Sequence, residues 1–382
     1  MEFHGLRAGV IGTGFIGPVH IEALKRNGIQ VTAICGGERA RKVAAKWNIA
    51  QVFTGYDHAA LVNSPEVDVV HITSPNKDHY PQSIAALKAG KHVVCEKPLA
   101  MTAKETAAIV KLARKSPKQI FAVNYNVRFN TAVLQMRADV RAGRLGEIIH
   151  VSGSYFQDWL LKPTDYNWRL LPEEGGKLRA VADIGTHWMD TASFILGSKI
   201  NSVYAHLATF HKTRKRPLGE VQTFTKASKD QKWKSYPVKT EDYASLLLQW
   251  ENGVHGNCGV SQVAAGRKNS IRIEIYGTER SAWWDSEEPN SIQYGSREMN
   301  LVSHRACPGF AGDVTGFTDY PPGHAEGFPD SFKMLYRAVY ADIAQGKYSK
   351  EPLYATAEDG DHEVRLCDAI LKSNRSRKWV KI

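Results

Sequence analysis

Apolar runs alternate with helical patterns at short intervals along the first 125 residues. This alternation is typical of βαβ units and predicts a parallel sheet with helices on both faces. Strands are expected over 7–11, 31–35, 51–53, 67–73, 92–96 and 120–123. Helices are expected between them over 16–26, 38–47, 79–89 and 102–115. Together these elements make a complete Rossmann nucleotide-binding fold.

After residue 146 the pattern changes to longer stretches in which apolar and polar residues alternate, which predicts an antiparallel sheet. Its strands are expected over 148–156, 203–210, 243–250, 254–261 and 271–276. Helices are expected over 183–196, 328–343 and 356–373, and loops over 217–239 and 287–324, which are rich in glycine, proline and polar residues.

The fold class is therefore an α/β Rossmann domain with a parallel sheet, followed by a C-terminal α+β domain with a large, mostly antiparallel sheet. A length of 382 residues agrees, because it exceeds what one hydrophobic core usually supports. The first domain is expected over 1–125 and the substrate-binding and oligomerisation domain over 126–382. Whether the final helix crosses back to the first domain is left open.

The composition predicts a cytoplasmic protein with no membrane partner. No apolar run approaches the roughly 18 residues of a membrane span, and the chain begins without a charged and apolar export signal. The cysteines form no C-x-x-C pair, which favours reduced, mostly buried thiols over a metal site or a disulfide framework. They are Cys35, Cys95, Cys258, Cys307 and Cys367.

The formal net charge of +11 raises the question of nucleic-acid binding. The basic residues are scattered among acidic ones, and only 212–216 (Lys-Thr-Arg-Lys-Arg) form a dense run. We therefore expect no nucleic-acid partner, and a phosphate-bearing cofactor explains part of the positive balance.

The sequence Gly12-Thr-Gly14-Phe-Ile-Gly17 directly follows the first predicted strand and opens the first helix. In this context Gly12 allows the tight turn, Gly14 lets the backbone approach a pyrophosphate, and Gly17 permits close helix–strand packing. The helix N-terminus supplies amide donors for phosphates.

An acidic residue usually follows the second strand of an NAD-preferring site and holds the ribose hydroxyls. Here the chain reads Cys35-Gly36-Gly37 instead, and Glu38 comes late. Arg39, followed by Arg41 and Lys42, either meets a 2′-phosphate or forms a solvated first helical turn. The cofactor is therefore NAD or NADP.

Three motifs together resemble one known family: the glycine turn, Thr73-Ser74-Pro75-Asn76 and Glu96-Lys97-Pro98, combined with the C-terminal antiparallel sheet. The family is the glucose–fructose oxidoreductase/inositol dehydrogenase/rhizopine catabolism (Gfo/Idh/MocA) family of oxidoreductases. The stretches 166–169, 175–176, 182–188 and 213–217 look particularly like its levoglucosan dehydrogenase branch. The resemblance implies a nicotinamide cofactor and a sugar or polyol substrate.

Lys97 is placed where a cation can hydrogen-bond the reacting hydroxyl, and apolar burial or a positive neighbour would bring its pKa toward useful acid–base chemistry. Pro98 would redirect the chain there, with a cis peptide bond as one way of doing so. The alternative is an exposed strand-end lysine paired with Glu96.

The spacing of Asp183, His187 and Asp190 places all three on one helical face and resembles the family's D-x-x-x-H-x-x-D pattern. His187 can take the hydroxyl proton as a general base. Asp183 is expected to contact substrate and Asp190 to orient the histidine. The alternatives are a helix cap, a buried structural histidine, or a metal-binding trio, of which the metal is least favoured because hydride transfer needs none.

The remaining site assignments come with the family resemblance. For the cofactor they are Gly12, Gly14, Phe15, Ile16, Gly17, Gly37, Arg39, Ser74, Pro75, Asn76, His79, Glu96, Lys97, Asn126 and Arg169. For the substrate they are Lys97, Arg128, Tyr155, Trp168, Arg169, Asp183, His187 and His324. Asn124 is a further pocket candidate, and no residue is assigned to a metal.

The leading hypothesis is an NAD(P)-dependent dehydrogenase that oxidises a secondary ring hydroxyl, with Lys97 and His187 handling the proton. The alternatives are an NADPH-dependent ketosugar reductase, a non-catalytic nucleotide or sugar sensor, and a structural or nucleic-acid-binding protein that uses the basic run. A helix-free sheet face also predicts a homodimer or homotetramer that packs sheet on sheet.

Overall fold

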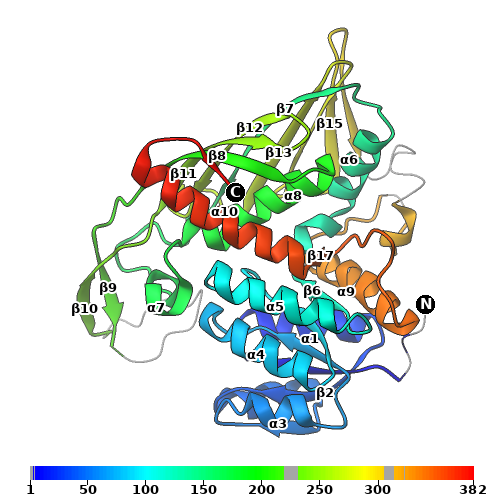
Figure 1. Cartoon of the computed structure of the whole chain (residues 1–382), viewed down its shortest axis with the longest axis vertical. Coiled ribbons are helices and arrows are strands. Elements are labelled where there is room, and N and C mark those ends of the chain that lie inside the picture. Colours follow the sequence, from blue (N-terminus) through cyan, green and yellow to red (C-terminus); the bar gives the residue numbers. More distant parts are fainter. Residues whose placement is uncertain (1–2, 4, 219–230, 305–313, 322) are drawn as a thin grey trace. The chain divides into compact units, whose positions relative to one another are not determined.

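The computed structural model divides into two compact units and describes residues 3, 5–218, 231–304, 314–321 and 323–382 (Figure 1). The first unit comprises Met1–Asn126 and Pro329–Val364, and the second comprises Val127–Phe328 and Arg365–Ile382. The sequence analysis placed one boundary after residue 125. The structure instead groups most of α9 (Phe328–Gln345) and the start of α10 (Ala357–Ser376) with the first unit.

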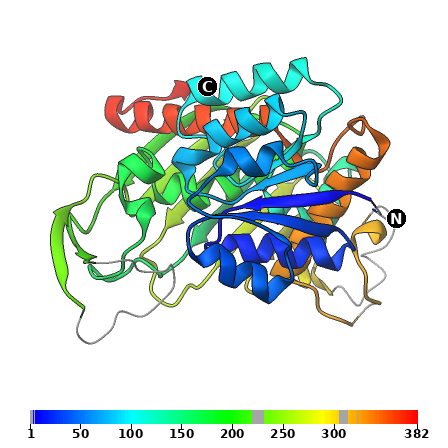
Figure 2. The ribbon, with the colours of Figure 1, turned by 90° about the horizontal axis from the view of Figure 1, so that it is seen from below.

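The first unit contains a seven-stranded sheet with helices on both faces (Figure 2). Its strands are β1 (Arg7–Ile11), β2 (Gln30–Cys35), β3 (Gln51–Phe53), β4 (Val69–Ile72), β5 (His92–Cys95), β6 (Phe121–Val123) and β17 (Ala355–Thr356). Its other helices are α1 (Ile16–Arg26), α2 (Arg39–Trp47), α3 (His58–Asn63), α4 (Asn76–Lys88) and α5 (Ala103–Lys115), and the 3₁₀ turn η1 (Asn126–Phe129) begins at its end.

The strand order is β17-β6-β5-β4-β1-β2-β3, with only β17 antiparallel to its neighbour. The first six strands therefore have the doubly wound Rossmann order, and the predicted parallel domain is confirmed. Strands covered on both faces need almost continuous apolar runs, which explains why β4 and β5 are mostly apolar and buried.

Helix α9 belongs to this unit because its aromatic side chains complete the unit's core. Tyr336 and Tyr340 are fully buried, and their rings contact His71 on β4 at centroid distances of 4.9 and 6.0 Å. Burying two large aromatic rings supplies several kilocalories per mole, on the order of 2 per side chain. A segment more than 200 positions from the Rossmann strands therefore becomes part of their domain.

The second unit is built on a nine-stranded sheet (Figure 1). Its strands are β7 (Ile148–Phe156), β8 (Ile200–Ala208), β11 (Tyr243–Trp250), β12 (His255–Ser261), β13 (Ser270–Gly277), β14 (Ser281–Asp285), β15 (Ser291–Gly295), β16 (Asn300–His304) and β18 (Val380–Lys381). A separate hairpin pairs β9 (Thr213–Pro217) with β10 (Trp233–Pro237).

Helices and turns complete this unit: α6 (Thr131–Arg141), η2 (Trp168–Leu170), α7 (Pro172–Gly175), the π-helical turn η3 (Val181–Gly185), α8 (Thr186–Leu196) and η5 (Thr315–Phe317). The sheet order is β16-β15-β14-β13-β7-β12-β11-β8-β18, and only β7 and β12 are parallel. The large, mostly antiparallel sheet is confirmed. Helix α8 packs against β7 and β13.

Several sequence expectations were wrong in detail. The expected loops over 217–239 and 287–324 contain β10, β15 and β16. These strands were missed because they are short, partly exposed and weakly alternating. Residues 219–230, 305–313 and 322 of those segments lie outside the described residues. The helix expected from residue 183 begins as a π-turn at Val181, and the helix expected from residue 79 begins at Asn76.

The dense basic run lies along β9, where alternate side chains point to opposite sides. Arg214 is fully buried and donates to Asp242 at 2.8 Å and to the backbone oxygens of Leu160 and Lys162. The run is therefore not one continuous cationic surface.

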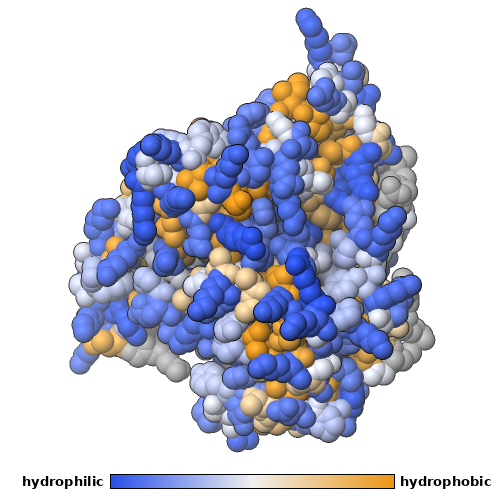
Figure 3. All heavy atoms as spheres, viewed as in Figure 1, coloured by the Kyte–Doolittle hydropathy of each residue, from blue (hydrophilic) through white to orange (hydrophobic). Residues whose placement is uncertain are grey.

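The face drawn in Figure 3 is mainly hydrophilic, with hydrophobic residues reaching the surface in separate places. Large exposed apolar side chains come from several elements, including Leu247 on β11 and Leu301 on β16. Among the described helices, none combines the length and the apolar character needed to cross a membrane.

Candidate active site

The glycine turn of the first unit joins β1 to α1 with little room to spare. Gly12 has φ +114°, and a Cβ there would lie 2.5 Å from the Thr73 hydroxyl oxygen. A Cβ on Gly17 would lie 2.3 Å from the carbonyl oxygen of Gly12. The turn and the close approach of helix to strand therefore require glycine at both positions.

Gly14 differs, because a Cβ there would meet nothing within 4 Å. Open space at this glycine lies beside the first amides of α1, whose N-terminus carries Phe15 and Ile16. Phe15 is 54% exposed. Open space at a helix N-terminus fits the pyrophosphate of a dinucleotide.

The end of β2 would face the adenosine part of the cofactor. A Cβ on Gly37 would lie 2.8 Å from the hydroxyl oxygen of Tyr56, which is 72% exposed. Arg39 is exposed at the first position of α2. The phenol of Tyr56 and the guanidinium of Arg39 therefore lie near the end of β2. The residues directly after the strand are Gly36 and Gly37, and neither carries a carboxylate.

The loop after β4 is tied to the Lys97-Pro98 turn by His79. This buried ring has one nitrogen 2.7 Å from the Pro98 oxygen and the other 2.9 Å from the Ser74 oxygen. Pro75 adopts an extended conformation before Asn76, which begins α4 and is buried. The contacts of His79 therefore fix two loops at the carboxyl edge of the sheet relative to each other.

Glu96 and Lys97 follow β5 at the same edge, and the Lys97–Pro98 peptide bond is cis, as the sequence analysis had raised. The Glu96 carboxylate is buried and accepts hydrogen bonds from His20 at 3.0 Å, from Asn124 at 2.5 Å and from the Lys97 backbone at 3.2 Å. Glu96 is therefore not one half of an exposed ion pair with Lys97 at the end of the strand, which was the alternative.

The pKa of the Glu96 carboxyl follows from these partners. Burial by itself raises that pKa, but the hydrogen bond and electrostatic attraction of His20, the charge of Lys97 and the hydrogen bond of Asn124 outweigh burial and lower it to about 2. Glu96 is therefore ionised throughout the range in which the protein would work.

Asn124 and Asn126 follow β6. The side-chain oxygen of Asn124 is buried and accepts no hydrogen bond from the described residues, so it can accept one from a bound group. Asn126 is also buried, and its amide donates to the Ser331 hydroxyl at 2.8 Å. The Asn126 side chain is therefore held by α9, the helix that carries Ser331.

In the second unit, Asp183 lies on the π-turn that precedes α8. Its carboxylate accepts from Arg169 Nε at 2.9 Å and from Gln262 Nε2 at 2.8 Å. The Arg169 guanidinium also lies 4.4 Å from the centre of the Trp168 ring. The structure therefore brings Trp168, Arg169 and Asp183 together, and adds Gln262.

His187, at the start of α8, is buried and packs edge-on to Tyr155 at a centroid distance of 6.2 Å. Tyr155 donates to Asn269 at 2.7 Å. Burial, followed by the nearby charge of Asp183, raises the pKa of the Tyr155 phenol well above its ordinary value. We call Tyr155, Arg169, Asp183, His187 and Gln262 the Asp183 cluster.

Asp190 and Arg128 form a buried pair in this unit. Arg128 donates through Nε to one Asp190 oxygen at 2.8 Å and through a terminal nitrogen to the other at 2.5 Å. This fork assigns Asp190 to Arg128, whereas the spacing alone had suggested a partner for His187. The prediction that Asp183, His187 and Asp190 share one helical face assumed a regular α-helix, but Asp183 lies on a π-turn.

Behind the π-turn lies a set of buried charges. Glu241 accepts backbone hydrogen bonds from Val181 at 2.9 Å and from Arg179 at 2.9 and 3.1 Å. Asp242 pairs with both Arg179 and Arg214, and all three side chains are fully buried. Burial raises the pKa of Glu241 to about 7, although its backbone donors and Arg179 oppose that shift.

Sequence reasoning missed the side chains that hold the predicted site residues in place. They are His20, His71, Gln262, Asn269, Arg179 and Glu241. One had a signal: His71 is the polar residue within the buried strand β4. A polar side chain inside an otherwise apolar strand needs a partner.

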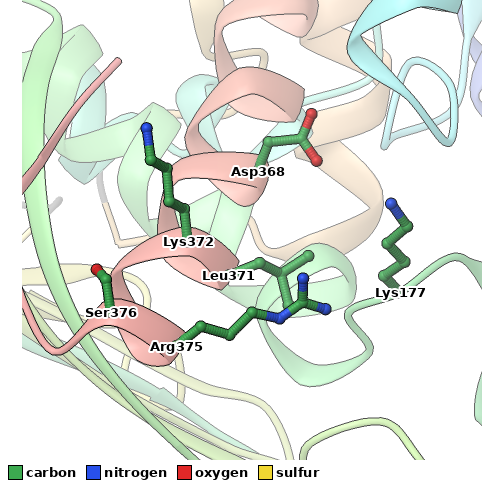
Figure 4. Close-up of a pocket in the computed structure, with 6 residues that line it drawn as sticks. All are labelled: Lys177, Asp368, Leu371, Lys372, Arg375 and Ser376. Carbon is green, nitrogen blue, oxygen red and sulfur yellow. The ribbon is translucent and has the colours of Figure 1, made fainter.

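Two further features are His324, an expected substrate contact, and a hollow beside α10. His324 is exposed, with its Nδ1 3.2 Å from the Pro321 oxygen. A hollow of about 370 Å³ opens beside α10 and contains no predicted site residue (Figure 4). It is lined by Lys177, Asp368, Leu371, Lys372, Arg375 and Ser376.

Four of the five cysteines lie within the described residues. Cys35, Cys95 and Cys258 are buried free thiols and Cys367 is partly buried, while Cys307 lies outside the described residues. Burial raises the pKa of Cys35 to about 12, so this thiol is unreactive at neutral pH. No three potential ligands are grouped for a metal ion in this part of the chain.

Comparison with known families matches both units. Residues 6–125 match the family described as "Oxidoreductase family, NAD-binding Rossmann fold", and residues 133–283 match "GFO/IDH/MocA C-terminal domain". The first unit is therefore an NAD-binding Rossmann domain.

Individual relatives agree over most of the length. Levoglucosan dehydrogenase of Pseudarthrobacter phenanthrenivorans is 28% identical over 392 residues, covering 99% of this chain and 98% of the relative. The uncharacterized oxidoreductase YfiI of Bacillus subtilis is 30% identical over 82% of this chain and 78% of its own. A solved levoglucosan dehydrogenase, in complex with NADH and levoglucosan, superposes with a TM-score of 0.87 at 26% identity over 99% of both chains.

The glycine turn, the Glu96-Lys97-Pro98 motif, the two sheets and the matches over both units lead to one assignment. This chain belongs to the Gfo/Idh/MocA family of oxidoreductases.

Proposed function

We propose that this protein is a dehydrogenase that oxidises a secondary ring hydroxyl of a sugar, anhydrosugar, glycoside or cyclitol. The observation that carries the proposal is the Asp183 cluster, where the Asp183 carboxylate is held by Arg169 and Gln262. Carboxylates and guanidinium groups bind vicinal hydroxyls, and an adjacent indole offers a flat face for a sugar ring. The likeness to levoglucosan dehydrogenase supports the same substrate class.

Bound NAD supplies the acceptor for the hydride that leaves the carbon. The protein's own part is to bind the substrate, orient it and remove the hydroxyl proton. In this proposal Lys97 and His187 carry out the acid–base chemistry, Asp183 and Arg169 hold hydroxyls, and Trp168 provides the ring face. General acid–base catalysis of this kind contributes about 10²- to 10⁴-fold.

The dinucleotide would lie on the glycine turn, with its pyrophosphate in the space at Gly14. Its adenosine ribose would approach the end of β2, where Gly37 and Arg39 lie. Because Arg39 can meet a 2′-phosphate, NADP is the alternative cofactor. With NADPH, the alternative reaction is reduction of a ketosugar. Both dinucleotides are therefore included in the test.

The test is a screen of sugars, anhydrosugars, glycosides and inositols with NAD⁺ and with NADP⁺, followed by the absorbance of the reduced nicotinamide. Lys97→Ala and His187→Ala should each lower turnover at least about 10²-fold. Lys88→Ala on α4 and His255→Ala on β12 are controls, because both side chains are exposed. Full turnover in both site variants would contradict the assignment of the acid–base residues.

A non-catalytic sensor would give a different result in the same screen. It would bind dinucleotide or sugar, detectable by a thermal shift, without turning over any compound with either cofactor. The cytoplasmic location expected from the sequence stays a prediction.

We also propose that the protein forms a homodimer or homotetramer through the open face of its nine-stranded sheet. Leu247 lies on β11, the third strand from one edge of that sheet, and is 46% exposed, beside the exposed Asn257 of β12. A broad sheet that carries exposed apolar side chains is suited to face-to-face packing in a symmetric pair.

A further inference from the structure

A chain of four side chains runs through the core of the first unit to the Lys97 turn. Tyr340 Oη lies 3.1 Å from His71 Nε2, His71 Nδ1 lies 3.1 Å from His20 Nδ1, and His20 Nε2 lies 3.0 Å from Glu96. The Tyr340 and both histidine side chains are fully buried.

The four groups come from four different elements. His20 lies on α1, one turn after the glycine fingerprint, His71 on β4, Glu96 directly after β5, and Tyr340 on α9. The chain therefore connects α1, the helix that follows the glycine turn, with the turn that carries Lys97. Two buried histidines and a carboxylate in a domain core are costly unless each has a partner, so their placement calls for a role.

The partners define how protons are distributed along the chain. In one arrangement Tyr340 donates to His71, His71 to His20, and His20 to Glu96, so that every link holds one hydrogen. Adding a proton to the histidine pair reverses two links: His20 then donates to His71 as well as to Glu96, and His71 donates to Tyr340. In both arrangements the Glu96 carboxylate accepts, and no heavy atom has to move.

Aromatic rings enclose the pair and keep water out. The Tyr336 ring lies 5.2 Å from His20 and 4.9 Å from His71, and Phe332 lies 5.8 Å from His20. A hydrogen-bonded chain in such a low-dielectric setting holds its members more firmly than the same bonds in water.

We propose that His20 and His71 are positioning residues for Lys97: with Tyr340 they hold the Glu96 carboxylate in place against the Lys97 backbone N–H. Glu96 accepts the Lys97 backbone N–H, so its position sets the course of the turn from which the lysine extends. The inference rests on the proposed acid–base role of Lys97.

Other groups around Glu96 decide how the site responds to pH. The titratable or polar groups that face it are His20 from α1, Asn124 after β6, His79 from α4, Tyr336 from α9, and Cys95 and Lys97 on either side. Burial, followed by the neighbouring His20, holds the pKa of His71 well below its ordinary value. At Glu96, burial raises the pKa, and His20 is the neighbour that lowers it most. Removing His20 should therefore raise the pKa of Glu96.

The experiment measures kcat and KM against pH for His20→Asn, His71→Leu and Tyr340→Phe in the full chain, with the best substrate of the screen. His20→Asn should lower kcat about 10²-fold, change KM less than about threefold, and move the acid limb of the kcat profile up by one pH unit or more. Tyr340→Phe deletes one oxygen at the far end of the chain and should lower kcat only about three- to tenfold. His92→Asn is the matched control, a partly buried histidine at the other end of β5.

A double variant separates this role from a general loss of stability. If His20 acts through Glu96, then adding His20→Asn to Glu96→Gln should cost little further kcat. NADH binding, followed by nicotinamide fluorescence, should change less than about threefold in Tyr340→Phe.

An unshifted acid limb in His20→Asn, or full additivity of His20→Asn with Glu96→Gln, would overturn the positioning role. The proposed function fails separately, because Lys97→Ala would then keep its turnover. Loss of turnover in Lys97→Ala with unchanged profiles in the chain variants would leave the function standing and refute only this inference.

Discussion

Arg128 and Asp190 meet through two parallel hydrogen bonds, of 2.8 and 2.5 Å, in a region where their side chains are 8% and 2% exposed. The guanidinium also lies 5.0 Å from the centre of the Phe194 ring. A buried fork of this kind fixes the start of the second unit to helix α8, the helix whose second residue is His187.

Asp190→Asn should destabilise the fold strongly, because it leaves the Arg128 charge buried with half of its partner gone. The expected loss in unfolding free energy is about 3 to 5 kcal/mol, measured by urea denaturation. The control is Glu358→Gln, whose ion pair with Arg114 is exposed and should change stability by less than about 1 kcal/mol. Equal losses in the two variants would contradict the buried-pair argument.

Glu241 should make stability depend on pH. Burial is the main cause that raises its pKa in the fold to about 7, above the ordinary value of 4.5, so the folded state binds more protons than the unfolded state between these values. Stability from this group is therefore fully present below about pH 4.5 and is lost as pH rises through 7, by up to about 3 kcal/mol.

Glu241→Gln should flatten that dependence while keeping an oxygen for the Val181 N–H. Urea unfolding of both proteins at a series of pH values from 5 to 8 gives the comparison. Parallel curves for the wild type and the variant would show that Glu241 does not titrate in this range.

Two alanine substitutions in the glycine turn should behave differently. Gly17→Ala places a Cβ 2.3 Å from the Gly12 oxygen and should cost about 1 to 3 kcal/mol of stability. Gly14→Ala meets no protein atom within 4 Å, so its melting temperature should stay near that of the wild type.

Gly14→Ala should instead weaken dinucleotide binding at least about tenfold, because its methyl group occupies the space expected for the pyrophosphate. NADH fluorescence titration measures this, beside thermal melting of both variants. Normal NADH affinity in Gly14→Ala would place the pyrophosphate elsewhere.

Sedimentation velocity at micromolar concentration should show a dimer or tetramer. Leu247→Lys puts a charge on the open sheet face, near the middle of β11, and should shift the protein toward monomer without a large loss of stability. Ser245→Lys, exposed two positions earlier on the same strand and face, tests whether the effect extends across the face. A wild-type protein that sediments only as a monomer would defeat the prediction.

The sequence by itself determined what depends on neighbours along the chain. The apolar runs of β1, β4 and β5, the glycine turn before α1, and the Glu96-Lys97-Pro98 turn are all local, and each was located correctly. Local patterns suffice there because strand burial and turn geometry act within a few residues.

Only the tertiary structure decided which side chains hold the candidate site residues. His20 meets His71 across 51 positions, Arg128 meets Asp190 across 62, and Gln262 meets Asp183 across 79. Hydrogen bonds between such distant positions leave no periodic trace in the chain, because they form only after the sheets and helices have packed. The sequence placed Glu96, Lys97, Asp183 and His187, and the fold supplied the partners that hold them.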